Sequence, residues 1–150
     1  MKISGGATIN VVNNGNVCSI TGHPLTPKTG GGCNISINWS DGGRVRIGPR
    51  EHKHGEIKLR SKNVSSGFHV ALAVDIERYL YGLAEMPSNW NVKALEAQAL
   101  VGRSYAVYHY LEKNRPNNKT DIDAGLDTSR QAYCWCHIGS TASSQYYYGY

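Results

Sequence analysis

The sequence predicts an α+β fold, in which a β-rich N-terminal half is packed against two helices. Three observations lead to this prediction. Apolar residues alternate with polar ones in short runs as far as about residue 74, which is typical of strands. Two later segments, beginning near residues 76 and 92, repeat apolar residues every three or four positions, which is typical of helices. A break that contains a proline separates these two segments.

The strands are expected where apolar residues alternate between turn signals. Residues 8–20 alternate loosely around Asn14-Gly15, a dipeptide that favours a two-residue hairpin turn. Residues 23–32 are rich in proline and glycine, which indicates a loop. Further strands are expected around four groups of residues: Ile35, Ile37 and Trp39; Val45 and Ile47; Ile57 and Leu59; and Phe68, Val70, Leu72 and Val74.

A short helix is expected directly after the strands. Asp75 is its predicted N-cap, because an aspartate side chain can accept a hydrogen bond from the first free N–H groups of a helix. Apolar residues then follow at helical spacing and form one stripe: Ile76, Tyr79, Leu80 and Leu83. Gly82 lies near the end of this helix, and Pro87 stops it because the residue before a proline avoids the helical conformation.

A second, longer helix is expected to begin with Ser88 or Asn89 as its cap. Its buried face is narrow and made of mostly small residues: Val92, Leu95, Ala99, Gly102 and Ala106. A glycine inside a helix costs about 1 kcal/mol relative to alanine. We therefore expect close packing against Gly102 to compensate, and we expect the helix to end near Lys113-Asn114.

The length and charge limit the class of protein. A chain of 150 residues is one ordinary domain by length and can bury a core. Its net charge of +5 and pI of about 9.1 favour anionic partners such as bacterial wall polymers. The basic residues are scattered without a long Lys/Arg run, so nucleic acid is not a predicted partner. No stretch approaches the ~18 consecutive apolar residues of a membrane helix, so no membrane segment is predicted in this chain.

The four cysteines allow three disulfide pairings, and their spacing does not choose among them. Cys18 and Cys33 bracket a turn-rich loop and would form a local bridge in an oxidising compartment. Cys134 and Cys136 leave three alternatives open, namely a disulfide, free thiols or a zinc site. Because a zinc site needs more ligands than this pair and no histidine stands at a telling spacing, no cofactor or metal is predicted, and zinc remains the lesser alternative.

The break between the two helices carries a carboxylate. Glu85 is followed by Met86, Pro87 and Trp90, so we expect the carboxylate to lie in apolar surroundings. Such surroundings keep a carboxyl group protonated near neutral pH, which a general acid requires. The alternative is a surface glutamate that caps the next helix, and the residue type alone favours that alternative.

Several motifs resemble one known family. Residues 79–90 read Tyr-Leu-Tyr-Gly-Leu-Ala-Glu-Met-Pro-Ser-Asn-Trp, and residues 94–106 read Ala-Leu-Glu-Ala-Gln-Ala-Leu-Val-Gly-Arg-Ser-Tyr-Ala. In this order they resemble the stage II sporulation protein D (SpoIID) family, also called the SpoIID/LytB or amidase-enhancer domain. Residues 140–150 resemble the family's Thr-x-x-x-Gln-x-Tyr-x-Gly element, although residues 127–133 fit it almost as well.

The resemblance also suggests a domain division. His54–Arg60 resembles the strand that opens the family's domain, whereas the residues before about 50 show no resemblance. We therefore expect a β-rich N-terminal extension over residues 1–50 and a SpoIID-like, peptidoglycan-acting domain over residues 51–150. Since the family's domain normally continues beyond the position of Tyr150, we expect this chain to be a fragment that is incomplete at its C-terminus.

The resemblance implies an activity and a location. Members of the family act on peptidoglycan, and those that are enzymes are lytic transglycosylases. The resemblance therefore implies that Glu85 is the catalytic acid/base that cleaves the bond between N-acetylmuramic acid (MurNAc) and N-acetylglucosamine (GlcNAc), with a 1,6-anhydro product. It also implies an extracytoplasmic protein, secreted or attached to the cell envelope, whose leader or anchor is absent from this chain. The gap from Gly82 to Glu85 is shorter than in many members, which predicts a tighter loop.

Five further residues are candidate contacts for peptidoglycan glycan strands: Arg103, Ser104, Gln145, Tyr147 and Trp90. Arg103 or Ser104 would line a glycan cleft or orient the acid, and the alternative is a structural or exposed role. Gln145 and Tyr147 resemble family positions near the cleft, and the alternative is an ordinary tyrosine-rich strand. Trp90 would stack on a sugar, although a buried aromatic residue in a core explains it equally well.

Other function classes stay open beside the enzyme. The first is a non-catalytic peptidoglycan-binding module that enhances a separate cell-wall amidase, which would then be a partner. The second is a structural role in the envelope through the sheet edges of residues 1–50. Formation of an anhydro product separates the enzyme from both, and binding to peptidoglycan without that product indicates the binding module.

Overall fold

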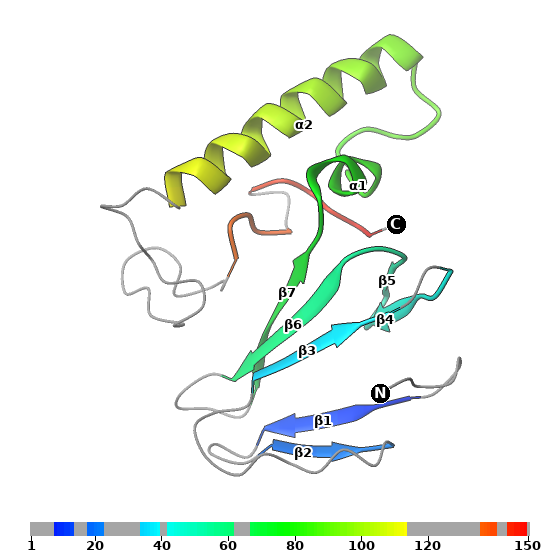
Figure 1. The fold of residues 1–150 in the computed structure, drawn as a ribbon. Helices are drawn as coiled ribbons and strands as arrows, with labels where there is room; N and C mark the ends of the chain where they lie inside the picture. The colour runs from blue at the N-terminus through cyan, green and yellow to red at the C-terminus, as the bar shows by residue number, and fades with distance from the viewer. Residues whose placement is uncertain are drawn as a thin grey trace. The chain divides into compact units, whose positions relative to one another are not determined.

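The computed structural model describes residues 8–13, 18–22, 34–39, 42–61, 67–113, 136–140 and 144–149 (Figure 1). The chain forms two compact units. The first contains residues 1–38 and 56–72, and the second contains residues 39–55 and 73–150. The described part of the chain is rich in strands before residue 74 and has its two helices after it, so the predicted α+β class is confirmed. The division at residue 50 stays a prediction.

The first unit contains a three-stranded sheet with β6 (Glu56–Ser61) in the middle, between β3 (Asn34–Asn38) and β7 (Phe68–Ala73). β3 and β6 are antiparallel, and Ile37 lies opposite Ile57. Because side chains alternate along a strand, the apolar residues of both strands share one face. Ile57 is 1% exposed at the centre of this face, so the alternation predicted from the sequence is confirmed.

The first unit also contains a pair of strands, β1 (Asn10–Asn13) and β2 (Cys18–Thr21), which are antiparallel. The predicted pair of strands is present, and Asn13 lies opposite Cys18. The predicted turn at Asn14-Gly15 lies outside the described residues.

The second unit begins with a hairpin of β4 (Val45–Ile47) and β5 (Arg50–His52). Gly48 and Pro49 join the two strands, since Ile47 lies opposite Arg50. Gly48 has φ +57°, a value that two-residue hairpin turns need and that glycine adopts without strain. The last residue of this hairpin, His52, lies beside Tyr147 of the candidate site.

Helix α1 (Ile76–Tyr81) begins where the sequence predicts. Its predicted end is wrong, because the helix stops before Leu83, well ahead of Pro87. Asp75 is its N-cap, and the carboxylate accepts a hydrogen bond of 3.0 Å from the backbone N–H of Arg78. Gly82 is its C-cap. The start depends on a single residue next to the helix, so local sequence was sufficient there. At the other end, Leu83 pairs with Tyr147 instead of continuing the helix.

Helix α2 (Val92–Lys113) ends as predicted, but its predicted cap is wrong. The side-chain oxygen of Asn91, rather than Ser88 or Asn89, accepts a hydrogen bond of 2.8 Å from the backbone N–H of Lys93. All three are good capping residues, and Ser88 and Asn89 form a turn before the helix instead. The helix therefore starts later and leaves a longer loop after α1.

One face of α2 is buried within the second unit, as the sequence predicts. Gly102 and Ala106 are buried, and Leu95 and Ala99 are half-buried. Val92, assigned to the same face, is 66% exposed, because it lies in the first turn of the helix and the burial begins further along. Several apolar side chains on other faces are also exposed: Leu100, Val101, Val107, Tyr108, Tyr110 and Leu111. Among the described residues, no helix is both long and apolar enough to cross a membrane.

Candidate functional site

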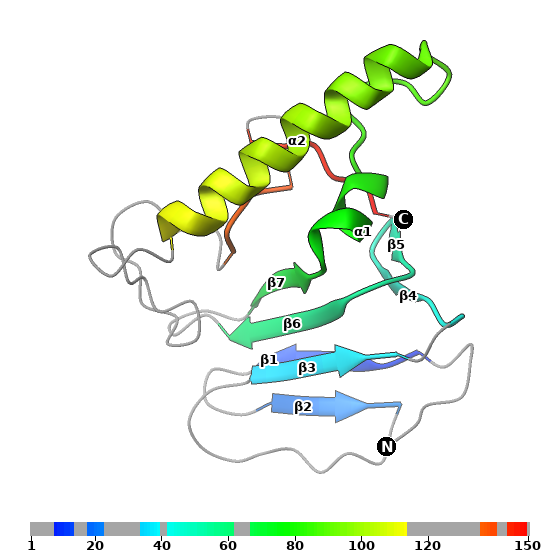
Figure 2. The same cartoon turned by 45° about the horizontal axis from the view of Figure 1, so that its top comes forward.

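The backbone just before Glu85 is held by the C-terminal segment. Leu83 and Tyr147 form an antiparallel bridge. The N–H of Ala84 donates to the carbonyl of Tyr146 at 3.0 Å, and the N–H of Tyr148 donates to the carbonyl of Gly82 at 3.0 Å. In Figures 1 and 2 this segment, drawn in red, runs beside α1. Two hydrogen bonds therefore fix residues 82–84, to which Glu85 is directly joined.

Tyr147 fills the space under this loop. It is 8% exposed, and its ring stacks on the ring of Tyr79 with centroids 5.1 Å apart. The ring of His52, from β5, lies parallel to it at 6.3 Å. A Cβ atom on Gly82 would overlap the Tyr147 ring, so only glycine allows this approach. Burial raises the pKa of Tyr147, so its hydroxyl stays neutral.

Gln145 is bound to the same cluster. It is 3% exposed, and its side-chain oxygen accepts a hydrogen bond of 2.6 Å from the hydroxyl of Tyr79. Burial, and after it the negative charge of Glu85, raises the pKa of Tyr79 far above its ordinary value. Tyr79 therefore remains protonated and continues to donate. We name the group of the half-buried Tyr79 and the buried Gln145, Tyr147 and His52 the loop clamp.

Gln145 and Tyr147 are both parts of the loop clamp. The sequence assigned both to a glycan cleft, with an ordinary strand as the alternative. In the structure both side chains are buried, and they pack beneath the loop that carries Glu85. Contact with a substrate stays a prediction for both, whereas support of the loop follows from the geometry.

Glu85 itself is exposed, and the predicted apolar enclosure is wrong for the described residues. Met86 is half-buried, whereas Pro87 is exposed and Trp90 is 53% exposed. The reason is that the break between the helices lies at the surface, and the first turn of α2 is exposed as well. An exposed carboxylate on a backbone held in place is accessible to a large polymer.

Arg103 and Ser104 have partners of their own. The guanidinium of Arg103 forms an ion pair of 2.5 Å with Glu77, and both side chains are exposed. The hydroxyl of Ser104 donates to the carbonyl of Leu100 at 2.9 Å, within α2. A substrate that recruits either group would therefore replace an existing contact, and their glycan-binding roles stay predictions.

The sequence did not single out two members of the loop clamp for this role. Tyr79 was assigned to the apolar stripe of α1 and to the family motif, but not to a hydrogen bond, because the partner of its hydroxyl lies 66 residues away. The alternation of His52 and His54 with Lys53 predicts a pair of surface histidines, but His52 is 7% exposed in the structure. The available signal for the hydrogen bond of Tyr79 was weak. A tyrosine in an apolar stripe indicates that its hydroxyl needs a partner when buried, but it does not indicate which residue that partner is.

Replacing Gly102 with alanine should lower the free energy of unfolding by about 1 kcal/mol. Alanine normally stabilises a helix interior by about 1 kcal/mol over glycine. Here the new Cβ would lie 2.5 Å from Leu83 Cδ1 and 2.9 Å from Gln145 Nε2, and Gln145 is both buried and bound to Tyr79. Such overpacking costs about 1–3 kcal/mol, so it outweighs the gain.

Urea unfolding checks this sign. Ala97→Gly, at an exposed position of the same helix, is the matched control and should lower stability by about 1 kcal/mol through helix propensity alone. A stabilised Gly102→Ala variant would contradict the close approach of Gln145 to the helix.

The stability of the second unit should fall as the pH drops below about 6.5, the ordinary pKa of histidine. Burial, and after it the charge of Arg50, lowers the pKa of His52. The unfolded chain therefore binds a proton at a higher pH than the folded chain, so stability is full above that value and is lost as the pH falls toward the folded pKa. His52 Nδ1 has no hydrogen-bond partner among the described residues, which fits the neutral ring.

The free energy of unfolding, measured between about pH 5 and 8, checks this for the wild type and His52→Phe. Phenylalanine keeps a flat ring beside Tyr147 but does not titrate, so its pH dependence should be shallower. Equal slopes for the two proteins would contradict the assignment to His52.

The cysteines are only partly described. Cys136 is disulfide-bonded, and Cys33 and Cys134 lie outside the described residues. A disulfide sulfur is not the thiolate that zinc binds, so in this structure Cys136 follows the disulfide alternative. In the described part of the chain, no group of three or more His, Cys, Asp or Glu side chains could hold a metal ion.

The fold and the site together define an α+β unit that presents an accessible carboxylate on a clamped loop. The SpoIID family model, described as "Stage II sporulation protein", matches residues 64–149, which include α1, α2, Glu85 and the C-terminal segment. The chain therefore belongs to the SpoIID family. Membership indicates a function related to the cell wall.

The chain is similar to an uncharacterized protein of Brachyspira hyodysenteriae, with 42% identity over 62 residues. The match covers 40% of this chain and 16% of that protein, so the chain spans a small part of the relative's length. No solved structure gives a significant match.

Proposed function

We propose that this chain carries the catalytic acid/base of a peptidoglycan lytic transglycosylase, an enzyme that cleaves the bond between MurNAc and GlcNAc. The observation that carries the proposal is the exposed carboxylate of Glu85, joined to a backbone that the C-terminal segment holds by two hydrogen bonds. A positioned acid is what glycosidic cleavage requires, because the proton must reach one defined oxygen. Accessibility matters equally, since a glycan strand is a large substrate.

The proposed reaction needs one carboxyl group in two protonation states. Protonated Glu85 donates its proton to the GlcNAc O4 atom as the bond from that oxygen to C1 of MurNAc breaks. Positive charge develops at C1, as in other glycosidic cleavages. The MurNAc O6 oxygen then forms a bond to C1, and the Glu85 carboxylate takes the proton from O6. The product carries a 1,6-anhydro ring, Glu85 is protonated again, and no water is consumed.

The surroundings of Glu85 support this single-acid route over ordinary hydrolysis. Hydrolysing glycosidases use two carboxyl groups at a defined separation. The acids nearest in sequence are already engaged: Asp75 caps α1, Glu77 pairs with Arg103, and Glu96 pairs with Lys93. None of these three carboxylates is therefore a clear candidate for a second catalytic group.

The substrate also suggests contacts and a location. Arg103, Ser104 and Trp90 are exposed and could bind the glycan strand. An enzyme that acts on peptidoglycan works outside the cytoplasm, so we propose an extracytoplasmic protein, secreted or attached to the envelope.

One observation favours a second candidate function. Glu85 is exposed and lacks the apolar enclosure typical of a catalytic acid, which suits a non-catalytic module that binds peptidoglycan and enhances a cell-wall amidase. In that function the clamped loop and its exposed aromatic residues would bind glycan, and a separate amidase would perform the chemistry.

Mass spectrometry of purified glycan strands after incubation with the protein tests the proposal. A transglycosylase leaves fragments that end in 1,6-anhydro-MurNAc and are lighter by one water than hydrolysis products. Fragments with ordinary reducing ends would overturn the proposed chemistry. Binding to the strands without cleavage would favour the amidase-enhancing module.

A further inference from the structure

Successive side chains of the C-terminal segment, residues 145–148, point to opposite sides of the segment. Gln145 and Tyr147 are buried in the loop clamp, whereas Tyr146 is half-buried and Tyr148 is 52% exposed. This is the alternation of a strand with one buried face. The outer positions of such a strand usually carry polar residues. Here both outer positions carry aromatic rings, which the family motif stated above does not require.

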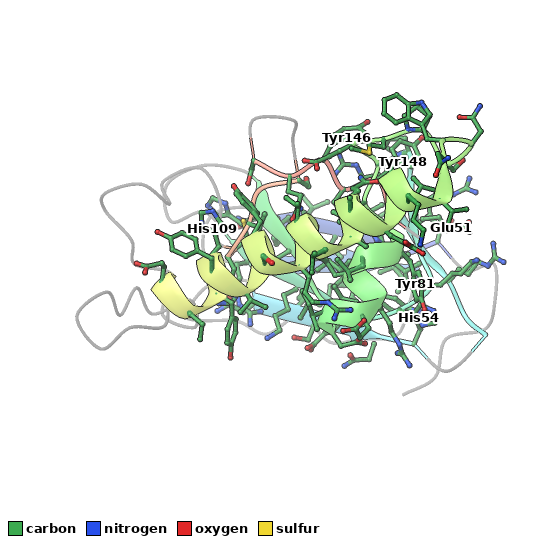
Figure 3. All side chains as sticks on the ribbon, turned by 90° about the horizontal axis from the view of Figure 1, so that it is seen from above. Glu51, His54, Tyr81, His109, Tyr146 and Tyr148 are labelled. Carbon is green, nitrogen blue, oxygen red and sulfur yellow. The ribbon has the colours of Figure 1, made fainter. Side chains whose placement is uncertain are left out.

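The two outer rings are close together and lack cover from the paired segment. Their centroids are 6.5 Å apart, and their planes are tilted by 44°. Figure 3 shows Tyr146 and Tyr148 next to each other, with Tyr81 apart from them. The residues bonded to them across the bridge are Ala84 and Gly82. Neither residue has a side chain that extends beyond Cβ, so neither can cover the rings.

We propose that Tyr146 and Tyr148 form a stacking subsite for the pyranose rings of a glycan strand, an inference that rests on the proposed function. The face of an aromatic ring is negative, and the C–H groups on the face of a pyranose are weakly positive, so the two surfaces attract each other. The tyrosine hydroxyls can at the same time bond to sugar hydroxyls.

The position of the pair links it to the acid. The carbonyl of Tyr146 accepts the hydrogen bond from Ala84, the residue before Glu85. A glycan strand that stacks on Tyr146 therefore passes the backbone that carries the catalytic carboxylate. Since these hydrogen bonds fix the main chain, the backbone of both tyrosines is in place before binding, which lowers the entropy lost on association.

Co-sedimentation with insoluble purified peptidoglycan tests the subsite. The double variant Tyr146→Ala/Tyr148→Ala should bind roughly tenfold more weakly than the wild type, because it loses two stacking contacts. Tyr146→Phe/Tyr148→Phe keeps the rings and should retain most of the binding. Tyr108→Ala removes a tyrosine that is 59% exposed on α2 and should bind like the wild type. Circular dichroism and thermal unfolding verify that each variant folds.

The outcomes separate this inference from the proposed function. If the wild type binds and a folded double alanine variant binds equally well, the subsite is overturned while the proposed function stands. If the wild type does not bind peptidoglycan at all, the proposed function and the subsite that rests on it both fail. Equal weakening by the Tyr108→Ala control would also overturn the inference, because the loss would not be specific to the outer pair.

Discussion

Replacing Glu85 with glutamine should abolish the 1,6-anhydro product. Glutamine has nearly the same size and shape, but its amide cannot donate and recover a proton as a carboxyl group does. Positioned acid–base groups contribute about 10²- to 10⁴-fold to rates, so the rate should fall by at least about 100-fold. Glu85 is exposed and is joined to a loop held by backbone hydrogen bonds, so the fold should be unaffected.

Mass spectrometry that counts anhydro ends measures the loss of product, and thermal unfolding measures the effect on the fold. Glu96→Gln is the matched control, because it removes an exposed carboxylate of α2 that pairs with Lys93. Surface ion pairs contribute about 0–1 kcal/mol, so this control should keep its stability and its activity. An active Glu85→Gln variant would remove Glu85 from the mechanism.

Replacing Tyr147 with alanine should destabilise the second unit by about 3–5 kcal/mol, the range found when large buried aromatic residues are truncated. The ring is 8% exposed, stacks on Tyr79 and occupies the space against Gly82. Its loss would leave a cavity beneath the bridge to Leu83. The loop with Glu85 would then lose its support, and any anhydro product should disappear together with the stability.

Urea unfolding and the product assay measure these two losses. Tyr147→Phe is the control, because it keeps the stacked ring and removes only the hydroxyl. It should retain most of the stability and the product. If the alanine variant unfolds no more easily than the phenylalanine variant, the ring does not support the loop as described.

Features that depend on neighbouring residues were predicted well. Asp75 begins α1 as expected, because capping is decided within one turn of the helix. The apolar alternation of β3 and β6 predicted the buried face that contains Ile57. The error at the start of α2 arose where Ser88, Asn89 and Asn91 offer similar capping chemistry, so that local preference could not choose.

By itself, the sequence determined the α+β class, the helices and the family, and it pointed to Glu85, because motif and spacing are properties of the chain. Only the tertiary structure decided which residues are buried around that position. It exposes Glu85 and buries Gln145 and Tyr147, the reverse of what their chemistry suggested. The physical reason is the pairing of residues 82–84 with residues 146–148, which are far apart in sequence and meet only after folding.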